Sequence, residues 1–176
     1  EIFDIREKIS IGGIPQKKLI TVIGRIRPAK GQLVVMKALA EPLKKRSDWG
    51  LLLIGMTDDK KYSDEIISVA GDNGISSQVH FIPESNEIIN YYRASSIIVI
   101  ASISEGFSLV CLEAMACGLI TIATEWVGIH SEVIINGVNG FLFPANDHES
   151  LSRILTGVMS GKISINKEKI GQTIVE

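Results

Sequence analysis

The segment 101–124 (ASISEGFSLVCLEAMACGLITIAT) constrains the fold of this chain more than any other stretch. It has the order of a strand end, a turn at Gly106, an apolar helix over 108–117 and a second strand. A helix that is apolar on every side is expected inside a domain. Glu113 is out of place in such a helix, because leaving a buried carboxylate unpaired costs on the order of 3 to 5 kcal/mol. Hydrogen-bond donors or a positive charge are therefore expected to reach Glu113.

A second carboxylate, Glu105, lies in the turn that opens this helix, about two helical turns before Glu113. Both side chains can therefore face the crevice outside the carboxyl ends of the strands. Gly106 allows a tight turn, and the free amides at the helix start would form an anion site. These amides belong to Phe107, Ser108 and Leu109. The pattern fits a nucleotide-sugar pocket, and it fits equally a Glu113 that pairs with a buried lysine or arginine beside a simple glycine turn.

Short apolar runs alternate with helical patterns along the chain. The expected strands are residues 19–23, 51–54, 79–82, 97–100, 119–123 and 141–143. The expected helices begin at Gln32, with a kink or restart at Pro42, and then cover 63–73, 87–93, 108–117 and a segment from a cap at Asn146 or Asp147 to Met159. This alternation predicts an α/β fold, a Rossmann-like, doubly wound parallel sheet of about six strands with helices on both faces.

Composition narrows the class of protein. At 176 residues the chain has the length of one domain and can bury a core, and 45% hydrophobic against 22% charged residues argues against disorder. The net charge of −2 gives no general attraction for nucleic acid, so an anion must be held by a local site. No apolar run approaches the roughly 20 residues of a membrane-spanning helix. We expect no signal peptide, and the absence of an initial methionine suggests a piece of a longer polypeptide.

The cysteines and histidines form no recognisable metal or disulfide pattern. Cys111 and Cys117 fall on different faces of the apolar helix, so we expect two small core residues, which suits a reducing cytosol. The histidines are scattered without the spacing of metal ligands, and they are His80, His130 and His148. The sequence therefore predicts no metal site.

Residues 105–113 (EGFSLVCLE) resemble the Glu-x7-Glu signature of the family-4 retaining glycosyltransferases, and the following AMACG continues that signature. Residues 22–31 (VIGRIRPAKG) resemble the Gly-Arg…Lys-Gly phosphate segment of the same family. Residues 137–144 (GVNGFLFP) resemble its closing Gly-x-x-Gly-aliphatic-x-x-Pro segment. The three segments agree in order and spacing from about Ile20 to Gly161, which is most of the chain.

The resemblance implies one half of a two-domain GT-B enzyme, in which two Rossmann-like domains enclose the active cleft. This chain resembles the C-terminal, donor-binding domain, with residues 19–161 as the domain itself. Residues 1–18 would then be an interdomain connection, and the polar residues 162–176 would lead toward an absent N-terminal domain. The implied reaction is transfer of a hexosyl group from a nucleotide-diphosphate sugar with retention of configuration, without a metal or another cofactor.

The resemblance also assigns roles to residues. Arg25 and Lys30 would neutralise the diphosphate leaving group, Glu113 would accept hydrogen bonds from the ribose, and Glu105 would contact the transferred sugar near the reacting centre without acting as a nucleophile. Without the resemblance, Arg25, Arg27 and Lys30 fit solvated surface charges, and Arg27 keeps that interpretation. The implied catalytic residues are Glu105, Arg25 and Lys30. The implied donor-binding residues are Gly24, Arg25, Lys30, Pro83, Glu84, Glu105, Gly106, Phe107, Ser108, Leu109 and Glu113, of which Pro83 and Glu84 would present backbone groups to the base.

The chain departs from the family pattern after the strand 119–123. Residues 124–132 read TEWVGIHSE, where the family commonly has Thr-x-x-Gly-Gly-Ile-Pro-Glu. Trp126 is expected to be a packed aromatic at the rim of the cleft, with stacking on a base or an acceptor as the alternative. His130 replaces the usual proline, and the sequence offers it no partner and no catalytic role.

The donor and the acceptor are inferred by resemblance alone. Residues 24–31 are similar to those of bacterial lipopolysaccharide-core mannosyltransferases, which suggests GDP-mannose, while UDP-linked sugars stay open. A glycan or lipid-linked acceptor would be held by the absent domain, in a cytoplasmic enzyme at the inner face of the membrane, and this chain alone should transfer nothing. Two alternatives are a nucleotide-sugar epimerase of the related two-domain fold and a non-catalytic nucleotide-binding module.

Overall fold

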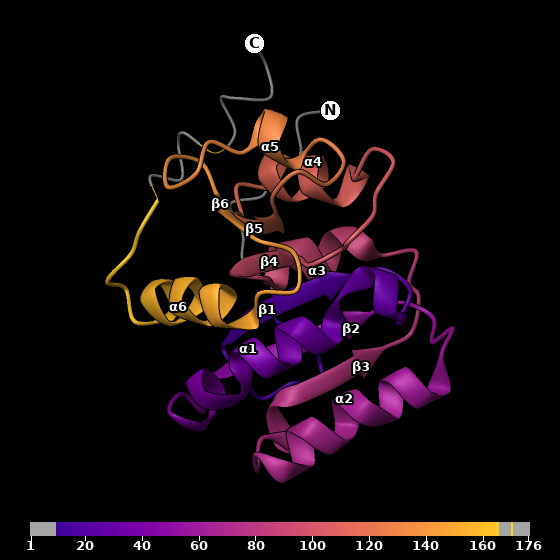
Figure 1. Cartoon of the computed structure of the whole chain (residues 1–176). Coiled ribbons are helices and arrows are strands. Elements are labelled where there is room, and N and C mark those ends of the chain that lie inside the picture. The colour runs from indigo at the N-terminus through magenta and orange to yellow at the C-terminus, as the bar shows by residue number, and fades with distance from the viewer. Residues whose placement is uncertain (1–9, 166–169, 171–176) are drawn as a thin grey trace.

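A computed structural model describes residues 10–165 and residue 170 of the chain (Figure 1). Within these residues, six parallel strands form one sheet in the order β3-β2-β1-β4-β5-β6. The strands are β1 (Lys18–Ile23), β2 (Trp49–Ile54), β3 (Val79–Ile82), β4 (Ile97–Ile100), β5 (Ile120–Thr124) and β6 (Phe141–Phe143). All six predicted strands are present, with ends that differ by no more than two residues. The predicted fold class is confirmed.

Helices connect the strands. They are α1 (Gln32–Lys44), α2 (Lys60–Asp72), α3 (Ile88–Ala94), α4 (Leu109–Ala116), α5 (His130–Val133) and α6 (His148–Met159), with short 3-10 turns at Pro28–Lys30 and Ser76–Gln78. The short helix α5 was not predicted. Helix α1 continues through Pro42, so of the two predicted alternatives, a kink or a restart, the restart is wrong. Helix α2 begins three residues earlier than expected because the Asp59 carboxylate caps it, accepting a hydrogen bond from the Tyr62 amide at 3.0 Å.

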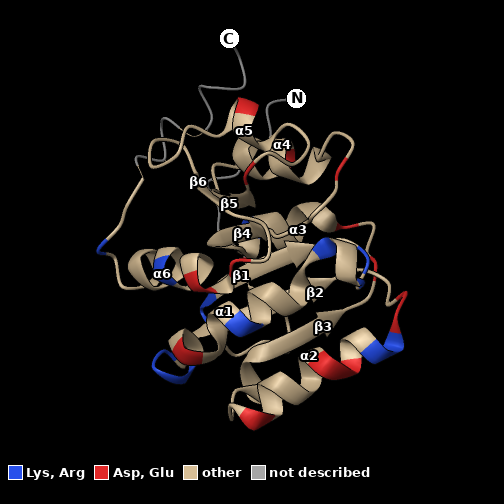
Figure 2. Ribbon diagram, viewed as in Figure 1, with Lys and Arg blue, Asp and Glu red and all other residues tan. Residues whose placement is uncertain are grey.

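The strands are buried on both faces, as a parallel sheet requires. In β1, Ile20 packs into the main core, whereas its neighbour Leu19 packs on the opposite face with Leu52 and with Ala94 of α3. This alternation follows from the two-residue period of a strand. Apart from Lys18, none of the six strands in the described residues carries Lys, Arg, Asp or Glu, and the described charges lie on helices and loops (Figure 2).

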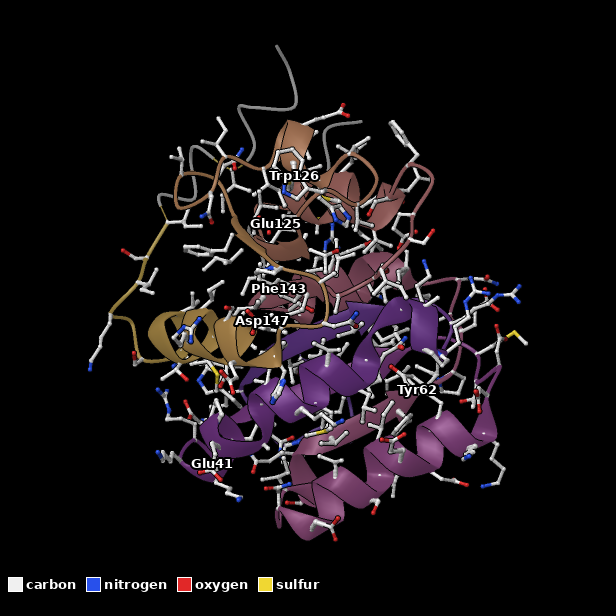
Figure 3. The ribbon with its side chains drawn as sticks, in the orientation of Figure 1. Glu41, Tyr62, Glu125, Trp126, Phe143 and Asp147 are labelled. Atoms are coloured by element: carbon white, nitrogen blue, oxygen red, sulfur yellow. The ribbon has the colours of Figure 1, made fainter. Side chains whose placement is uncertain are left out.

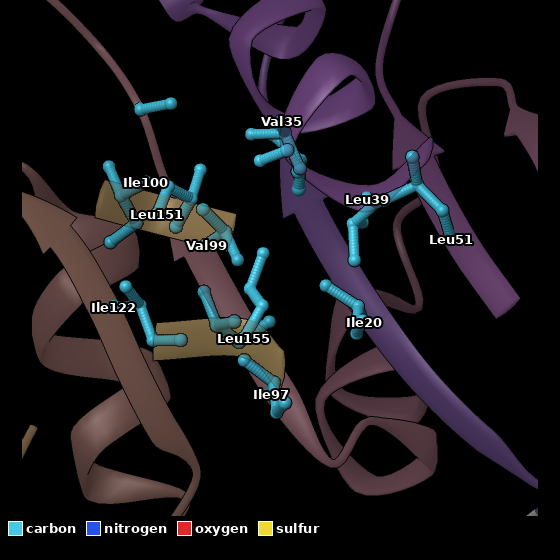
Figure 4. Packing of buried hydrophobic residues seen from close by; sticks show 14 of the residues in the cluster. Ile20, Val35, Leu39, Leu51, Ile97, Val99, Ile100, Ile122, Leu151 and Leu155 are labelled. Carbon is cyan, nitrogen blue, oxygen red and sulfur yellow. The ribbon is translucent and has the colours of Figure 1, made fainter. Parts of the chain in front are cut away.

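Much of the main core lies between the sheet and the layer of α1, α2 and α6, which contact one another through α1. The same cluster continues to Tyr92 of α3 and to Cys111, Ala114 and Met115 of α4. Leu39 of α1 and Leu155 of α6 pack over Ile20, Val99 and Ile122 from three neighbouring strands, and all five side chains are buried (Figure 4). Of the remaining helices, α3 contacts β1, where its Ala94 packs on the opposite face with Leu19, and α4 contacts β4 and β5. Helices therefore cover both faces, as the sequence predicts.

Two predicted segments fall partly outside the described residues. The connection 1–18 is described only from residue 10, and the polar tail 162–176 only to residue 165 and at residue 170. None of the helices in the described part of the chain is both long and apolar enough to cross a membrane.

Candidate functional site

The strand order reverses between β1 and β4, which are neighbours in the sheet. The chain leaves β1 toward β2 on one side, and leaves β4 toward β5 on the other. The loops after these two strands therefore emerge side by side at the carboxyl edge of the sheet. Open α/β sheets bind ligands at such a switch point. Residues 24–31 and 101–108, which carry most of the predicted site, make up these two loops.

Lys30 and Glu105 meet between the two loops. The Lys30 Nζ donates to the Glu105 Oε1 at 2.7 Å, although the residues are 75 positions apart in sequence. The Lys30 side chain is 21% exposed and the Glu105 side chain is 15% exposed. The loops are also joined by the Ile103 amide, which donates to the Ala29 carbonyl at 3.0 Å. The sequence prediction that these two charged residues share one site is consistent with this geometry.

The Glu105 carboxylate is stabilised in its ionised form. Burial alone would raise the pKa of Glu105, but the hydrogen bonds from Lys30 and Ser102 and the positive charge of Lys30 together hold it below its ordinary value. Glu105 is therefore a carboxylate at neutral pH and can accept hydrogen bonds from a ligand. Ser102, which donates one of these hydrogen bonds, was not predicted as a site residue.

Arg25 points to a different neighbour. Its guanidinium lies 3.5 Å from the Asp58 carboxylate on the loop after β2, and 63% of its side chain is exposed. The Gln32 side-chain amide donates to the Arg25 carbonyl at 2.9 Å and holds the loop backbone. An exposed ion pair of this kind contributes little energy, so the guanidinium can leave Asp58 for a stronger anion. Arg27 is exposed, in agreement with its predicted surface role.

The start of α4 lacks a side-chain cap. Ser108 occupies the N-cap position in the left-handed region, with φ 47° and ψ 63°, but its hydroxyl makes no capping bond. The hydroxyl instead lies 2.8 Å from the Nε2 atom of His130. The first backbone amides of α4 therefore stay available to an anion, together with the positive end of the helix dipole. The exposed Gly106 and Phe107 precede this helix start.

His130 has two hydrogen-bond partners that the sequence did not identify. Its ring is fully buried, with Nδ1 2.8 Å from the Thr124 carbonyl and Nε2 2.8 Å from the Ser108 hydroxyl. The carbonyl can only accept, so Nδ1 carries the proton and Nε2 accepts from Ser108. Burial lowers the pKa of His130, which favours this neutral form. His130 thus ties the loop after β5 to the start of α4.

We expect acidification to destabilise the fold through His130. Burial depresses its pKa in the folded state from the ordinary 6.5, so the unfolded chain takes up a proton more readily. The free energy of unfolding that comes from neutral His130 is therefore fully present above pH 6.5, the ordinary pKa. It is lost as the pH falls from 6.5 toward the lower pKa of the folded state. Urea unfolding between pH 7 and 5.5 should show this loss. His130→Gln should reduce the slope of the free energy of unfolding against pH. The matched control is His80→Gln, because burial also lowers the pKa of His80. This variant should remove only the part of the pH dependence that comes from His80. An unchanged slope in His130→Gln would contradict the assignment.

Glu113 is not buried, which corrects the expectation for the central helix. Helix α4 turns Cys111, Ala114 and Met115 to the core, while Glu113 and Leu109 are exposed on its other side. The expected hydrogen-bond donor is present, because the Glu113 carboxylate accepts from the Tyr92 hydroxyl at 2.6 Å, and the alternative of a buried lysine or arginine partner is not found among the described residues. Apolar composition could not show that only one face of α4 is covered.

The residues predicted to face a nucleobase line a surface hollow. Pro83 and Glu84, both exposed, follow β3. With residues 55–57 after β2 and with Phe81 and Ile82, they enclose about 290 Å³. A larger hollow of about 590 Å³ between α1 and α6 contains none of the predicted site residues. We favour the smaller one as a ligand site because it lies at the carboxyl ends of strands.

Trp126 is not packed, so the expectation of a packed rim aromatic is wrong. It lies on the loop between β5 and α5 with 83% of its side chain exposed (Figure 3). Its φ of 60° is unusual for a bulky residue, and the Ser131 hydroxyl accepts a hydrogen bond from its amide at 2.8 Å. Two residues later, Gly128 approaches Glu105 so closely that an added Cβ would lie 3.1 Å from the Glu105 Cβ.

Both cysteines are free thiols, with Cys111 buried and Cys117 half-buried. Burial raises the pKa of Cys111 to about 12 and, with the nearby Glu113, that of Cys117 to about 11. Such thiols are unreactive. Among the described residues, no group of three or more His, Cys, Asp or Glu side chains could hold a metal ion.

The sheet order and the Lys30–Glu105 pair at the carboxyl edge define a Rossmann-type α/β domain with a candidate ligand site at the switch point. A family model described as "Glycosyl transferases group 1" matches residues 4–173. The chain belongs to this family. The glycosyltransferase resemblance found in the sequence is confirmed.

Individual relatives agree with this assignment. The lipopolysaccharide core biosynthesis mannosyltransferase LpcC of Rhizobium leguminosarum bv. viciae is 30% identical over 149 residues, which are 84% of this chain and 42% of that protein. A D-inositol 3-phosphate glycosyltransferase of Frankia alni is 34% identical over 149 residues, 78% of this chain and 36% of its own length. The chain therefore spans less than half the length of these curated relatives.

Solved structures show the same domain. The C-terminal domain of the group 1 glycosyl transferase LpcC from Francisella tularensis superposes with a TM-score of 0.81 at 36% identity, covering 91% of this chain and 83% of that one. Anabaena Alr3699/HepE, in complex with UDP and glucose, has a TM-score of 0.80 at 24% identity, covering 91% of this chain and 44% of its own. The fold is thus that of a GT-B C-terminal domain.

Proposed function

We propose that this chain is the donor-binding half of a retaining hexosyltransferase that moves a hexosyl group from a nucleotide-diphosphate sugar to a glycan or lipid-linked acceptor. The observation that carries the proposal is the 2.7 Å pair of Lys30 and Glu105 at the switch point of the sheet, beside the uncapped start of α4. A cation, free amides and a carboxylate at one edge of the sheet suit a ligand that combines phosphates with sugar hydroxyls.

Each part of the donor has a matching part of the site. The base would occupy the hollow beside Pro83 and Glu84, and the ribose hydroxyls would donate to Glu113. Lys30, Arg25 and the first amides of α4 would hold the diphosphate, with Gly24 beneath the Lys30 stem. Their positive charge would stabilise the leaving group as the glycosidic bond breaks, the task that a metal ion performs in other enzymes. Glu105 would accept hydrogen bonds from the transferred sugar.

Retention is proposed to occur on one face of the sugar, with the leaving phosphate assisting as base. Glu105 would then orient the hexose and balance positive charge at the anomeric carbon without forming a covalent bond. This differs from the usual retaining glycosidase, in which two carboxylates about 5 Å apart act as nucleophile and acid. The Lys30 partner of Glu105 supports the assignment, because it lowers the basicity and nucleophilicity of the carboxylate.

The acceptor is proposed to bind the other half of the enzyme. Residues 19–161 would be the donor domain, 1–18 the connection and 162–176 the return toward that half. We propose that the whole enzyme works in the cytoplasm, at the inner membrane face where a lipid-linked acceptor would be used. The chain alone should bind donor weakly and transfer nothing.

GDP-mannose is the donor that we favour. Lipopolysaccharide-core mannosyltransferases are among the relatives, at 30% identity for the Rhizobium leguminosarum LpcC and 31% for LpsB of Rhizobium meliloti. The Anabaena neighbour, similar in fold alone, was solved with UDP, so UDP-linked sugars stay in the test.

Calorimetric titration of this chain with GDP, UDP and ADP tests the proposal. We expect a preference for GDP, and we expect Lys30→Ala and Glu113→Ala each to weaken binding by about 1 to 3 kcal/mol, since each removes one partner of a polar contact. Arg27→Ala, on the same loop as Lys30, is the matched control and should bind as the wild type does. The absence of binding by any of the three nucleotides would contradict the proposed donor site.

A further inference from the structure

Tyr92 is a buried side chain to which the proposed function gives no role. It lies on α3 with 2% of its surface exposed, and its ring belongs to the main core. Its hydroxyl emerges from this core and meets the Glu113 Oε2 on α4 at 2.6 Å. A core residue and an exposed carboxylate on two different helices are thus joined by one short hydrogen bond.

The direction of this bond is fixed. A carboxylate only accepts, so the phenol donates. Burial, together with the hydrogen bond to Glu113 and the negative charge of Glu113, raises the pKa of Tyr92 well above its ordinary value, and the hydroxyl therefore keeps its proton. The separation of 2.6 Å is that of a charge-assisted O–H···O⁻ bond, which is about twice as strong as a neutral one.

The bond restricts a side chain that would otherwise be mobile. An exposed glutamate on a helix samples several rotamers, and ordering it costs conformational entropy. The Tyr92 ring is fixed by packing, so its hydroxyl anchors Oε2 in one place. The Oε1 atom has no partner among the described residues and stays open to a hydroxyl donor. Glu113 is thus held in one orientation before any ligand arrives.

We propose that Tyr92 is the positioning residue that presents the Glu113 carboxylate to the ribose hydroxyls of the donor nucleotide. The inference rests on the proposed function, from which it takes the contact between Glu113 and the ribose. Tyr92 touches no part of the ligand. It strengthens recognition of the ribose because part of the ordering cost of Glu113 is met when the domain folds.

The test compares ribonucleotides with their 2′-deoxy and 3′-deoxy forms. Calorimetry on the wild-type chain with GDP and UDP should show that loss of the recognised hydroxyl weakens binding by about tenfold or more, the usual value of a hydrogen bond to a charged group. Tyr92→Phe removes only the anchoring hydroxyl and should reduce this ribose preference by about five- to tenfold. The preference between GDP and UDP should not change, since Tyr92 does not reach the base.

Tyr91→Phe is the matched control. Tyr91 lies on the same helix, is half-buried, and its hydroxyl has no hydrogen-bond partner in the described part of the chain. Its variant should keep the ribose preference of the wild type. In the Glu113→Ala background, Tyr92→Phe should have no further effect on the preference, because the residue acts only through Glu113.

The outcomes separate the two proposals. A Tyr92→Phe variant with the wild-type ribose preference would overturn the positioning role and leave the donor site intact. A Tyr92→Phe effect that persists without Glu113 would also overturn it. A wild-type chain that binds no nucleotide, or that does not distinguish ribose from its deoxy forms, would overturn the assignment of Glu113 and the role of Tyr92 with it. A thermal unfolding curve of each variant identifies a loss of binding that comes from unfolding.

Discussion

Replacing Lys30 by alanine is expected to lower kcat for sugar transfer by about a hundred- to a thousandfold, the usual cost of removing one group that stabilises charge in a transition state. The reason is that Lys30 lies at the switch point, 2.7 Å from Glu105, where the proposed diphosphate would gain negative charge as it leaves. The rate should be measured in the polypeptide that joins this domain to its acceptor-binding half. The effect on KM for the donor should be smaller than that on kcat.

Two further readings of the Lys30 variants distinguish charge from shape. Lys30→Ala removes the main cation that lowers the pKa of Glu105, while burial, which raises it, remains. The Glu105 pKa should therefore rise, and the acidic limb of the pH–rate profile should move to higher pH. Lys30→Arg keeps the charge with another geometry and should recover part of the rate. Arg27→Ala, which removes an exposed cation from the same loop, should leave kcat unchanged. A Lys30→Ala enzyme with a wild-type rate would refute the role.

The strands were predictable because a parallel sheet is buried on both faces. Runs such as 97–100 (IIVI) contain no polar residue, and flanking glycines or polar loops mark where they end. The turn pattern alone singled out Glu105 as a candidate site residue, whereas Lys30 became a candidate only through the family resemblance. Their separation of 75 residues hides the contact until β1 and β4 are known to be neighbours.

The remaining parts of the site depend on contacts between distant segments. The partner of Glu113 is Tyr92, and the partner of His130 is Ser108, and neither pair has a sequence pattern. The apolar sequence of α4 indicated full burial, but a helix on the surface of a sheet buries one face whatever its other face contains. Trp126 was expected to pack for the same reason. Hydrophobicity predicts a preference for burial, and only the fold determines which side chains obtain it.

Gly31 explains why the two halves of the site can come so close, and its replacement should affect the fold more than that of another left-handed glycine. Gly31 precedes α1 at φ 69°, and a Cβ there would lie 2.1 Å from the carbonyl oxygen of Ala101, directly after β4. Without a side chain at this position, the loop after β1 rests on the end of β4, and the neighbouring Lys30 reaches Glu105. Gly31→Ala should therefore combine backbone strain with a clash against main-chain atoms that cannot rotate away.

Gly74→Ala provides the matched control. Gly74 has φ 68°, nearly that of Gly31, but a Cβ there would meet no atom within 4 Å. The free energy of unfolding of this variant should fall only by the cost of a left-handed non-glycine residue, about 1 to 2 kcal/mol. The free energy of unfolding of Gly31→Ala should fall by about 3 to 5 kcal/mol, because overpacking adds to the same backbone strain. Urea unfolding with equal m values would give the difference between the two variants. Equal losses would mean that the β4 loop moves aside freely, and the close approach of residues 24–31 to β4 would then not be what holds Lys30 against Glu105.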